Sequence, residues 1–409
     1  MIIDLIHWVS LIVATIVSYI FFRDLGDITQ AFLTVKRKGM IFAIRHEKLM
    51  ISIGLVGTGI AIYTAVKYDV GFKPLTYVLG AINLFSVGFP YVWLHFGLRN
   101  QQDHARYYSI EEAKNYLRSD ESVIVLENKG ETRAHSDFHI KRPHLAGTPE
   151  GLGGENVILT YCCMTHLGTG YIPEINGEKL DLEILAQHGN NLIMRDEGTG
   201  EPIQQMYGTR ECDGRWSNNK MQAWPTFRMP FSAYAKAYPE GKVFLNKIVP
   251  FTKNPVLWLW DNIVEIVFLW ATVSHHRTQS LLTSTMDVDD DRLLRKELVW
   301  GFTIGKDSMA YSEKYIREQG NIVNTNVGGR DIVASYDPEY ESVNIWYNDS
   351  GKAIKKIDFF GKSDQGELKR VETVKAGLYW FVWINYYPES QLNDDGVVNT
   401  EYEHLFGPA

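Results

Sequence analysis

The sequence predicts an α+β protein in which three N-terminal transmembrane helices precede two related β-rich repeats, packed as one unit, with an amphipathic helix between them. Three observations predict this fold class. Long uncharged runs come before residue 98, short β-like runs split by Gly, Asn and Asp follow from about residue 118, and the later region is similar to itself. The formal net charge of -8 argues against nucleic acid as a partner, because phosphate binding requires a basic surface.

Three apolar segments have the length of a membrane span. Residues 5–22, 49–66 and 74–97 contain no Asp, Glu, Lys or Arg, and about 18 such residues nearly cross a hydrocarbon core. The first segment lacks the basic start and the small-residue cleavage site of a signal peptide, so we expect it to remain in the mature protein. We assign residues 1–98 to a transmembrane domain whose partner is the lipid bilayer.

Basic residues predict the orientation of these spans. They concentrate in the first loop and after the third span, whereas only Lys67 and Lys73 flank the turn between the second and third spans. The positive-inside rule then places Met1 outside an inner membrane, and the first loop and everything after Gly97 in the cytoplasm. The residues that carry this prediction are Arg23, Lys36, Arg37, Lys38, Arg45, Lys48, Arg99, Arg106, Lys114 and Arg118.

Beyond a connecting segment at 99–119 the chain repeats itself. The stretches "ESVIVLENKGETRAHS" and "GLGGENVILTYCC" resemble "ELVWGFTIGKDSMAYS" and "NVGGRDIVASYDP". Gly153-Gly154 corresponds to Gly328-Gly329, and both copies close on Tyr-Pro-Glu. We assign the first repeat to residues 120–250 and the second, degenerate repeat to residues 290–392.

The segment between the repeats, 251–289, holds an apolar stretch at 254–276. Asp261 and Glu265 lie one turn apart in its middle, where charge in lipid is costly, and a span here would separate the repeats across the membrane. We therefore expect an amphipathic helix on the membrane surface or against the three spans, with a fourth span as the alternative. Residues 393–409 form a C-terminal tail.

Cysteine distinguishes the two repeats. "ILTYCCMTHLGTGY" places Cys162 and Cys163 ahead of His166, whereas Asp337 stands opposite Cys162 in the second repeat. The second repeat has neither cysteine nor histidine. If the fold alone required these residues, both repeats should keep them. Any chemistry is therefore expected in the first repeat, with the second as its structural partner.

Thiolate and imidazole groups are the ligands that copper and zinc prefer. A regular strand would turn Cys162 and Cys163 to opposite faces, but a turn that starts at Cys163 would bring it close to His166. Together with His144, these residues would supply ligands and leave one position open, as catalytic metals require. We predict a metal site of Cys162, Cys163, His166 and His144, with copper as the first candidate and zinc as the second. Second-tier ligands are His135, His139 and His188.

Both repeats resemble the bacterial and archaeal family known as domain of unknown function 3179. The likeness rests on "GGENVILTYCC", "NLIMRDEGTGEPIQQ", "AYPEG" and "DDRLLRKELVWGF", and it covers about residues 120–392. The resemblance implies a histidine near His144 but no established reaction. Cys163 stands where the family usually has proline, and Thr165-His166 where some members have cysteine and glycine. Family members often look exported, which implies the opposite side of the membrane from the basic residues.

These patterns predict a membrane-anchored metal-binding protein, with copper first, in metal handling or redox chemistry at the membrane. One alternative is a non-catalytic interaction or scaffold subunit, in which the cysteines only pack. Another is a thiol oxidoreductase with a reactive cysteine. A membrane protein partner or a homo-oligomer fits each of these, and the patterns leave open whether the protein is an enzyme.

Overall fold

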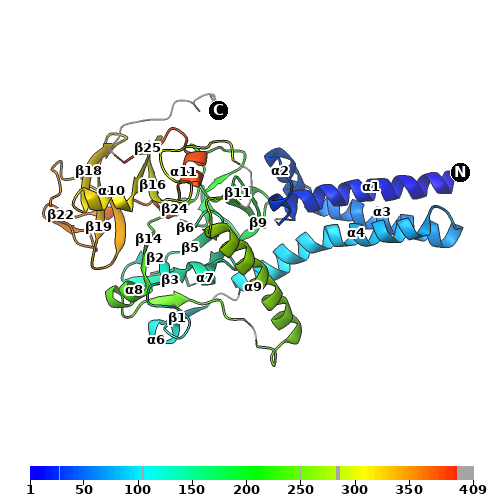
Figure 1. Cartoon of the computed structure of the whole chain (residues 1–409), viewed down its shortest axis with the longest axis horizontal. Coiled ribbons are helices and arrows are strands. Elements are labelled where there is room, and N and C mark those ends of the chain that lie inside the picture. Colours follow the sequence, from blue (N-terminus) through cyan, green and yellow to red (C-terminus); the bar gives the residue numbers. More distant parts are fainter. Residues whose placement is uncertain (27, 104–105, 149, 249, 282–285, 394–409) are drawn as a thin grey trace.

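The computed structural model describes residues 1–26, 28–103, 106–148, 150–248, 250–281 and 286–393. A long helical bundle projects from one side of a β-rich body (Figure 1). Long apolar helices come first and several sheets follow, so the predicted α+β class is confirmed. Residues 394–409, nearly all of the expected tail, lie outside the described residues.

The bundle consists of three long helices at the positions of the three expected spans. They are α1 (Ile2–Leu25), α3 (Glu47–Tyr68) and α4 (Lys73–Tyr91), the last continued by the π-helix η2 (Val92–Leu98) and by α5 (Arg99–Asp103). By length and composition each can cross a membrane, which makes the protein membrane-associated. The first loop carries η1 (Ile28–Ala31) and α2 (Arg37–Arg45).

Polar side chains join the three spans inside the bundle. His7 of α1 is fully buried, and its ring nitrogens lie 3.1 Å from the Thr64 hydroxyl and 3.2 Å from the Thr76 hydroxyl. Asn83 of α4 donates to the Thr58 hydroxyl of α3 at 3.1 Å. Lipid offers no hydrogen-bond partner, so such groups stabilise helix association when they pair with each other. The polar residue of the first span thus packs inward.

Two sheets share one plan, one in each half of the β-rich body. In each, a central hairpin has an antiparallel neighbour on one side and a parallel neighbour on the other. The first is β1-β15-β3-β2-β14 and the second is β24-β16-β17-β25. Their strands are β1 (Tyr107–Ser109), β2 (Ser122–Asn128), β3 (Glu131–Ser136), β14 (Phe227–Pro230), β15 (Lys242–Phe244), β16 (Leu298–Ile304), β17 (Asp307–Ser312), β24 (Lys375–Tyr379) and β25 (Gln391–Leu392).

The short helices of the two halves also correspond. A helix capped by the hydroxyl of Ser136 or Ser312 follows the central hairpin, and another helix ends at Tyr238 or Tyr387 with nearly the same backbone angles. These helices are α7 (Asp137–Ile140), α8 (Phe231–Ala237), α10 (Glu313–Glu318) and α11 (Trp380–Tyr386). A further short helix, α6 (Ile110–Ala113), follows β1.

A second pair of sheets also corresponds, β13-β6-β5-β4 in the first half and β18-β19-β20-β23 in the second. In both, the glycine pair forms a two-residue turn with positive φ at each residue, 55° and 84° at Gly153-Gly154 and 56° and 77° at Gly328-Gly329, a conformation that suits glycine. The strands are β4 (Leu145–Ala146), β5 (Ile158–Cys162), β6 (Leu167–Ile172), β13 (Gln222–Trp224), β18 (Ile322–Val327), β19 (Arg330–Asp337), β20 (Ser342–Tyr347) and β23 (Lys369–Arg370).

The first half has a four-stranded sheet that the described residues of the second half do not have. Its order is β12-β11-β10-β9, and it faces the bundle (Figure 1). The strands are β9 (Leu182–His188), β10 (Asn191–Asp196), β11 (Pro202–Gln204) and β12 (Thr209–Arg210). Two small hairpins complete the body, β7 (Glu174–Ile175) with β8 (Glu178–Lys179) and β21 (Lys362–Ser363) with β22 (Gly366–Glu367).

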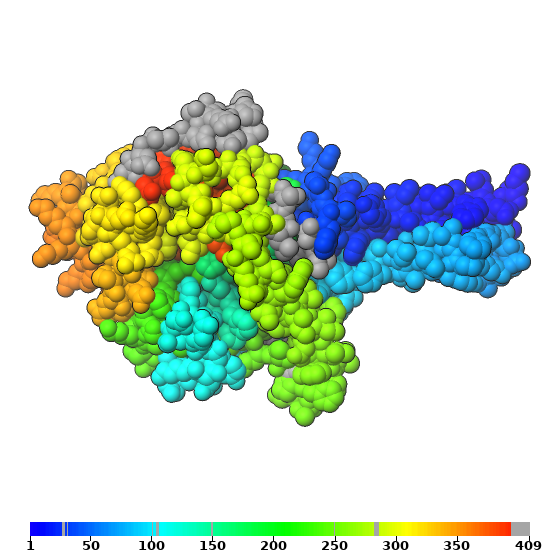
Figure 2. Space-filling view, in the orientation of Figure 1, coloured from blue at the N-terminus to red at the C-terminus, as the bar shows by residue number. Residues whose placement is uncertain are grey.

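The helix α9 (Pro255–His276) occupies the segment expected to be amphipathic. It runs across the end of the bundle rather than along it (Figures 1 and 2). Length and composition would let it span a membrane, but both of its central carboxylates contact the β-rich body. Asp261 lies 3.3 Å from Arg142, and Glu265 lies 2.6 Å from Lys141. The opposite face is apolar and exposed, as at Ile266, which is 66% exposed.

Candidate functional site

A cavity of about 290 Å³ lies where the third span, α9 and the first half meet. Its walls are mainly aliphatic and aromatic, and Trp93, Trp260 and Phe268 are among the largest side chains. Trp93 stacks on Phe268 with ring centres 5.7 Å apart, so the span end and α9 form one continuous wall. The volume is at the lower end of the range for small-molecule sites, and its apolar lining is typical of them.

Two adjacent thiols line this cavity. The strand β5 ends at Cys162 and a turn begins at Cys163, so the strand alternation is broken and both side chains reach the same space. The predicted turn is therefore present. Both residues are at least 95% buried. None of the three cysteines, all within the described ranges, forms a disulfide, and Cys212 is exposed elsewhere.

His144 lines the same cavity and is 5% exposed. Its ring meets Phe268 edge-on at 5.2 Å, and its backbone carbonyl accepts from the backbone N–H of Tyr161 at 2.7 Å. Burial lowers the pKa of His144 to about 4, so the ring is neutral near pH 7. The Nδ1 atom has no hydrogen-bond partner among the described residues, which is uncommon for a buried polar atom.

His166 does not line the cavity. Its Nε2 lies 2.9 Å from Asp137 and its Nδ1 lies 2.7 Å from the carbonyl of Gly377, so both ring nitrogens face oxygens that accept. Arg228 donates to the same Asp137 carboxylate at 2.7 Å. The Arg228 guanidinium, with the His166 ring beside it, holds the pKa of Asp137 well below its usual value, against the opposing effect of its burial. The structure thus places His166 in an ion cluster at the junction of the two halves.

The second-tier histidines are buried in separate places. His135 contacts the Tyr107 hydroxyl at 2.8 Å, and His139 accepts from the backbone N–H of Asn246 at 3.2 Å. Burial lowers their pKa values to about 3 and about 4, and the pKa of His188 to about 4. Within the described part of the chain, no group of three or more His, Cys, Asp and Glu side chains is placed to hold a metal ion.

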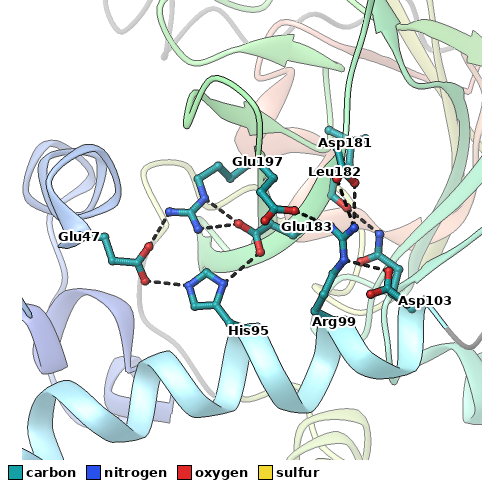
Figure 3. Close-up of polar contacts among 10 residues, drawn as sticks. Glu47, His95, Arg99, Asp103, Asp181, Leu182, Glu183 and Glu197 are labelled. Atoms are coloured by element: carbon teal, nitrogen blue, oxygen red, sulfur yellow. Dashed lines mark hydrogen bonds and ion pairs between the residues drawn. The ribbon is translucent and has the colours of Figure 1, made fainter.

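A buried charge network joins the spans to the wall of the cavity (Figure 3). Glu47, at the start of α3, pairs with Arg195 of β10 at 2.6 Å and with His95 of η2 at 2.9 Å. His95 lies 3.1 Å from Glu183 of β9, which also pairs with Arg195. Arg195 and His95 hold the pKa of Glu183 below its usual value, although burial acts in the opposite direction. The next residue along β9, Ile184, lines the cavity.

Further ion pairs surround this network. Arg99 reaches Asp181 at 3.0 Å (Figure 3), and Arg45 reaches Glu201 at 3.0 Å. The first loop therefore contacts the β-rich body at the same end of the bundle as the end of the third long helix. Sequence reasoning missed the Glu47 network. The sequence features that could have indicated this network are Glu47, just before the second uncharged run, and His95, near the end of the third.

Fold and site together define a membrane-associated protein with a β-rich body and an apolar cavity where this body meets the helical bundle. Residues 88–390 match the family described as "Protein of unknown function (DUF3179)", and the chain belongs to this family. The match begins before Trp93 and His95, so the end of the third span is part of the family unit. No curated protein and no solved structure matches the chain.

Proposed function

We propose that this protein binds an apolar molecule drawn from the membrane in the cavity between the third span, α9 and the first half. The observation that carries the proposal is the lining itself. A cavity walled by Trp93, Phe268 and Leu192 repels charged solutes and stabilises hydrocarbon by burial.

The position of the cavity supports a ligand that comes from lipid. One wall is the end of a span, and another is α9, whose remaining surface exposes Leu259, Ile266 and Leu269. Exposed apolar side chains on a helix that crosses the bundle end suit the boundary between headgroups and acyl chains. A ligand therefore reaches the cavity without passing through water.

Binding can be tested by filling the cavity. Purified protein in detergent is mixed with a fluorescent long-chain fatty alcohol, and Ala271→Trp is compared with Ile266→Trp. Ala271 lines the cavity, whereas Ile266 lies on the same helix and is exposed. We expect wild type and Ile266→Trp to bind and Ala271→Trp to lose at least tenfold in affinity. Equal binding by all three proteins, or none by wild type, would overturn the proposal.

A second candidate function is the binding of a soft metal ion in the same cavity. Cys162, Cys163, Met164 and His144 all line it, and thiolate, thioether and imidazole groups favour Cu(I), with Zn(II) as the alternative. Of the predicted set, His166 lies in the ion cluster with Asp137, and the Cys162 thiol donates to the carbonyl of Asn190 at 3.9 Å. Metal analysis of wild type and a Cys162→Ser, Cys163→Ser variant tests this function, which requires stoichiometric metal in wild type alone.

The remaining alternatives give other outcomes in these experiments. A thiol oxidoreductase requires Cys163 to react with an alkylating reagent faster than free cysteine does. A scaffold subunit or a homo-oligomer would show neither ligand, metal nor fast thiol, and would instead co-purify with a membrane partner or a second copy.

We further propose that the β-rich body lies in the cytoplasm. The support is the excess of basic residues in the first loop, although Arg45 and Arg99 are paired with carboxylates of the body and so also serve to dock it. Cys212 is the exposed cysteine and reports on this directly. An impermeant maleimide should label Cys212 only after the cells are permeabilised, and labelling of intact cells would place the body outside.

We infer that the two halves are related copies of one unit. The matching strand orders, glycine-pair turns and serine-capped helices support this. The second half packs on the first through Lys375, which donates to Thr169 and Tyr171, each at 3.0 Å. In this view the second half is a structural support for the half that faces the membrane.

A further inference from the structure

The cavity has an opening that is bordered by α9 and by the third span. Ile263 and Trp270 of α9 line the cavity and are nevertheless 46% and 51% exposed, whereas Leu192 on β10 is buried. Side chains that line a cavity and are half exposed mark the place where it opens. Phe89 of α4 also lines the cavity and is only partly buried, so the third span borders the opening as well.

A row of stacked aromatic rings leads from the outer surface of the third span to the cavity. Phe85 is 58% exposed, and its ring stacks on Phe89 with centres 5.4 Å apart. Phe89 stacks in turn on the buried Trp93 at 5.5 Å, and Trp93 stacks on Phe268 in the cavity wall. Exposure thus falls along one continuous apolar surface from Phe85 to Phe268.

The outer part of this row lies at the depth of the lipid chains. Lys73, which pairs with Asp69, marks one edge of the hydrocarbon core, and the uncharged run begins at the next residue. At 1.5 Å per residue, Phe85 and Phe89 lie about 18 Å and about 24 Å from Lys73, within a hydrocarbon core of about 30 Å. The opening beside Phe89 therefore faces hydrocarbon.

The third span changes its form where it meets the cavity. Pro90 has no N–H to donate inside α4, and the π-helix η2 begins at Val92. Trp93, Leu94 and Leu98 of this π-helix all line the cavity. π-Helical segments are rare and occur frequently at functional sites. The irregular end of the span thus forms a wall of the cavity.

The size of the cavity limits what part of a ligand it can hold. A volume of about 290 Å³ is at the lower end of the range for small-molecule sites and is too small for a whole membrane lipid. The end of one hydrocarbon chain fits such a space. A polar headgroup does not suit it, because burial among Leu192 and Phe268 would cost the hydrogen bonds that the headgroup makes with water.

We propose that the cavity binds the free end of a hydrocarbon chain of a membrane lipid, which enters sideways between α4 and α9 along Phe85, Phe89 and Trp93. The headgroup and the rest of the lipid stay in the bilayer. This inference rests on the proposed apolar-ligand function, and it names the class of ligand and the direction in which it enters.

A matched pair of probes in bilayers tests the direction of entry. Wild type is placed in phosphatidylcholine vesicles that contain a phosphatidylcholine with a photoreactive diazirine, either at the end of an acyl chain or next to its carboxyl group. Crosslinked peptides are identified by mass spectrometry. We expect the chain-end probe to label the peptides that hold Met164 and Leu192 about tenfold more than the carboxyl-end probe, which corresponds to roughly 1.4 kcal/mol. Labelling of α1 and α3 by each probe serves to normalise the two.

Two variants of α9 test the opening. Ile263→Trp enlarges a side chain at the opening, whereas Ile266→Trp makes the same change on the exposed face of the same helix, outside the cavity lining. In Ile263→Trp, chain-end labelling of Met164 and Leu192 should fall to the level of the carboxyl-end probe. Ile266→Trp should be labelled like wild type. The probe comparison in wild type does not depend on the folding of either variant.

The outcomes separate this inference from the proposed function. Equal labelling of the cavity peptides by both probes, or chain-end labelling that is unchanged in Ile263→Trp, would overturn the inference. Loss of labelling in both variants would also overturn it, because access would then not depend on the opening. In each case, binding of the fluorescent fatty alcohol by wild type in detergent would leave the apolar-ligand function in place. Absence of both binding and labelling would overturn the two together.

Discussion

The two β-rich halves use the same strand order but differ in what covers them. In the first half, β5 ends at Cys162 beside the cavity, under the third span and α9. In the second half, the corresponding strand β19 ends at Asp337, whose carboxylate accepts from the backbone N–H groups of Glu339 and Tyr340, each at 2.9 Å. The two equivalent positions thus differ: Cys162 is a buried thiol in the first half, and Asp337 is a carboxylate that forms a turn in the second.

The difference also extends to the sheets. The first half adds β9 to β12, and these strands supply Glu183 and Arg195 to the network that holds the spans. The second half has its glycine-pair hairpin far from the bundle (Figure 1). The comparison teaches that a common strand order occurs in both halves, while the added sheet and the turn at Cys163 connect the first half to the helical bundle and the cavity. Exchanging residues between the halves should therefore have unequal effects.

The largest effect is expected when the residue of the second half is placed in the first. Cys162→Asp would put a carboxylate into an apolar cavity, and an uncompensated buried charge costs about 3–5 kcal/mol. We expect a large fall in the melting temperature of the detergent-solubilised protein. Cys162→Ser keeps the size of the side chain and adds no charge, so its melting temperature should fall far less. A Cys162→Asp protein as stable as wild type would contradict the burial of Cys162 in the structure.

The next largest loss of stability is expected in the buried charge network that joins the spans to β9 and β10. Arg195→Leu leaves Glu47 and Glu183 with only His95 as a cationic partner, and we expect a loss of about 3 kcal/mol because both carboxylates are buried. Thermal unfolding and protease sensitivity of β9–β12 measure this loss. The control is Arg330→Leu in the second half, whose exposed pair with Asp349 should contribute less than about 1 kcal/mol.

The junction between the halves should show a pH dependence. Burial, with a smaller effect of Lys220, lowers the pKa of Lys375 to about 7. An unfolded lysine keeps its proton up to about pH 10.4, so between pH 7 and 10 the unfolded state binds more protons and stability rises with pH. The slope from this group is at most about 1.4 kcal/mol per pH unit.

The control for this slope is Lys375→Met. It keeps an unbranched chain and removes the proton, so the slope of stability between pH 7 and 10 should decrease relative to wild type. Stability is measured by denaturant unfolding at fixed pH values. An identical slope in both proteins would show that Lys375 is hydrated in solution.

The smallest effect is expected from the reverse exchange. Asp337→Cys removes two hydrogen bonds in a surface turn, and we expect a cost of about 1 kcal/mol. Ligand binding in the cavity should be unchanged, because β19 lies in the other half. A loss of binding in this variant would mean that the halves are coupled more closely than the contacts indicate.

Several elements could be predicted because their causes are local. The spans follow from uncharged runs of sufficient length, and the glycine pairs mark turns that require positive φ. The turn at Cys163 was also predictable, and it brings both thiols to one cavity with His144. The location of His166 was not, because its partner Gly377 lies 211 residues away.

The sequence by itself determined the apolar spans, the two similar halves and the confinement of cysteine to one of them, since these depend on composition and order along the chain. Only the tertiary structure decided which charges pair between the helical bundle and the β-rich body, which histidine lines the same cavity as the thiols and where that cavity lies. The side-chain contact between Glu47 and Arg195 joins residues that are 148 positions apart, and local sequence patterns do not predict contacts over such a separation.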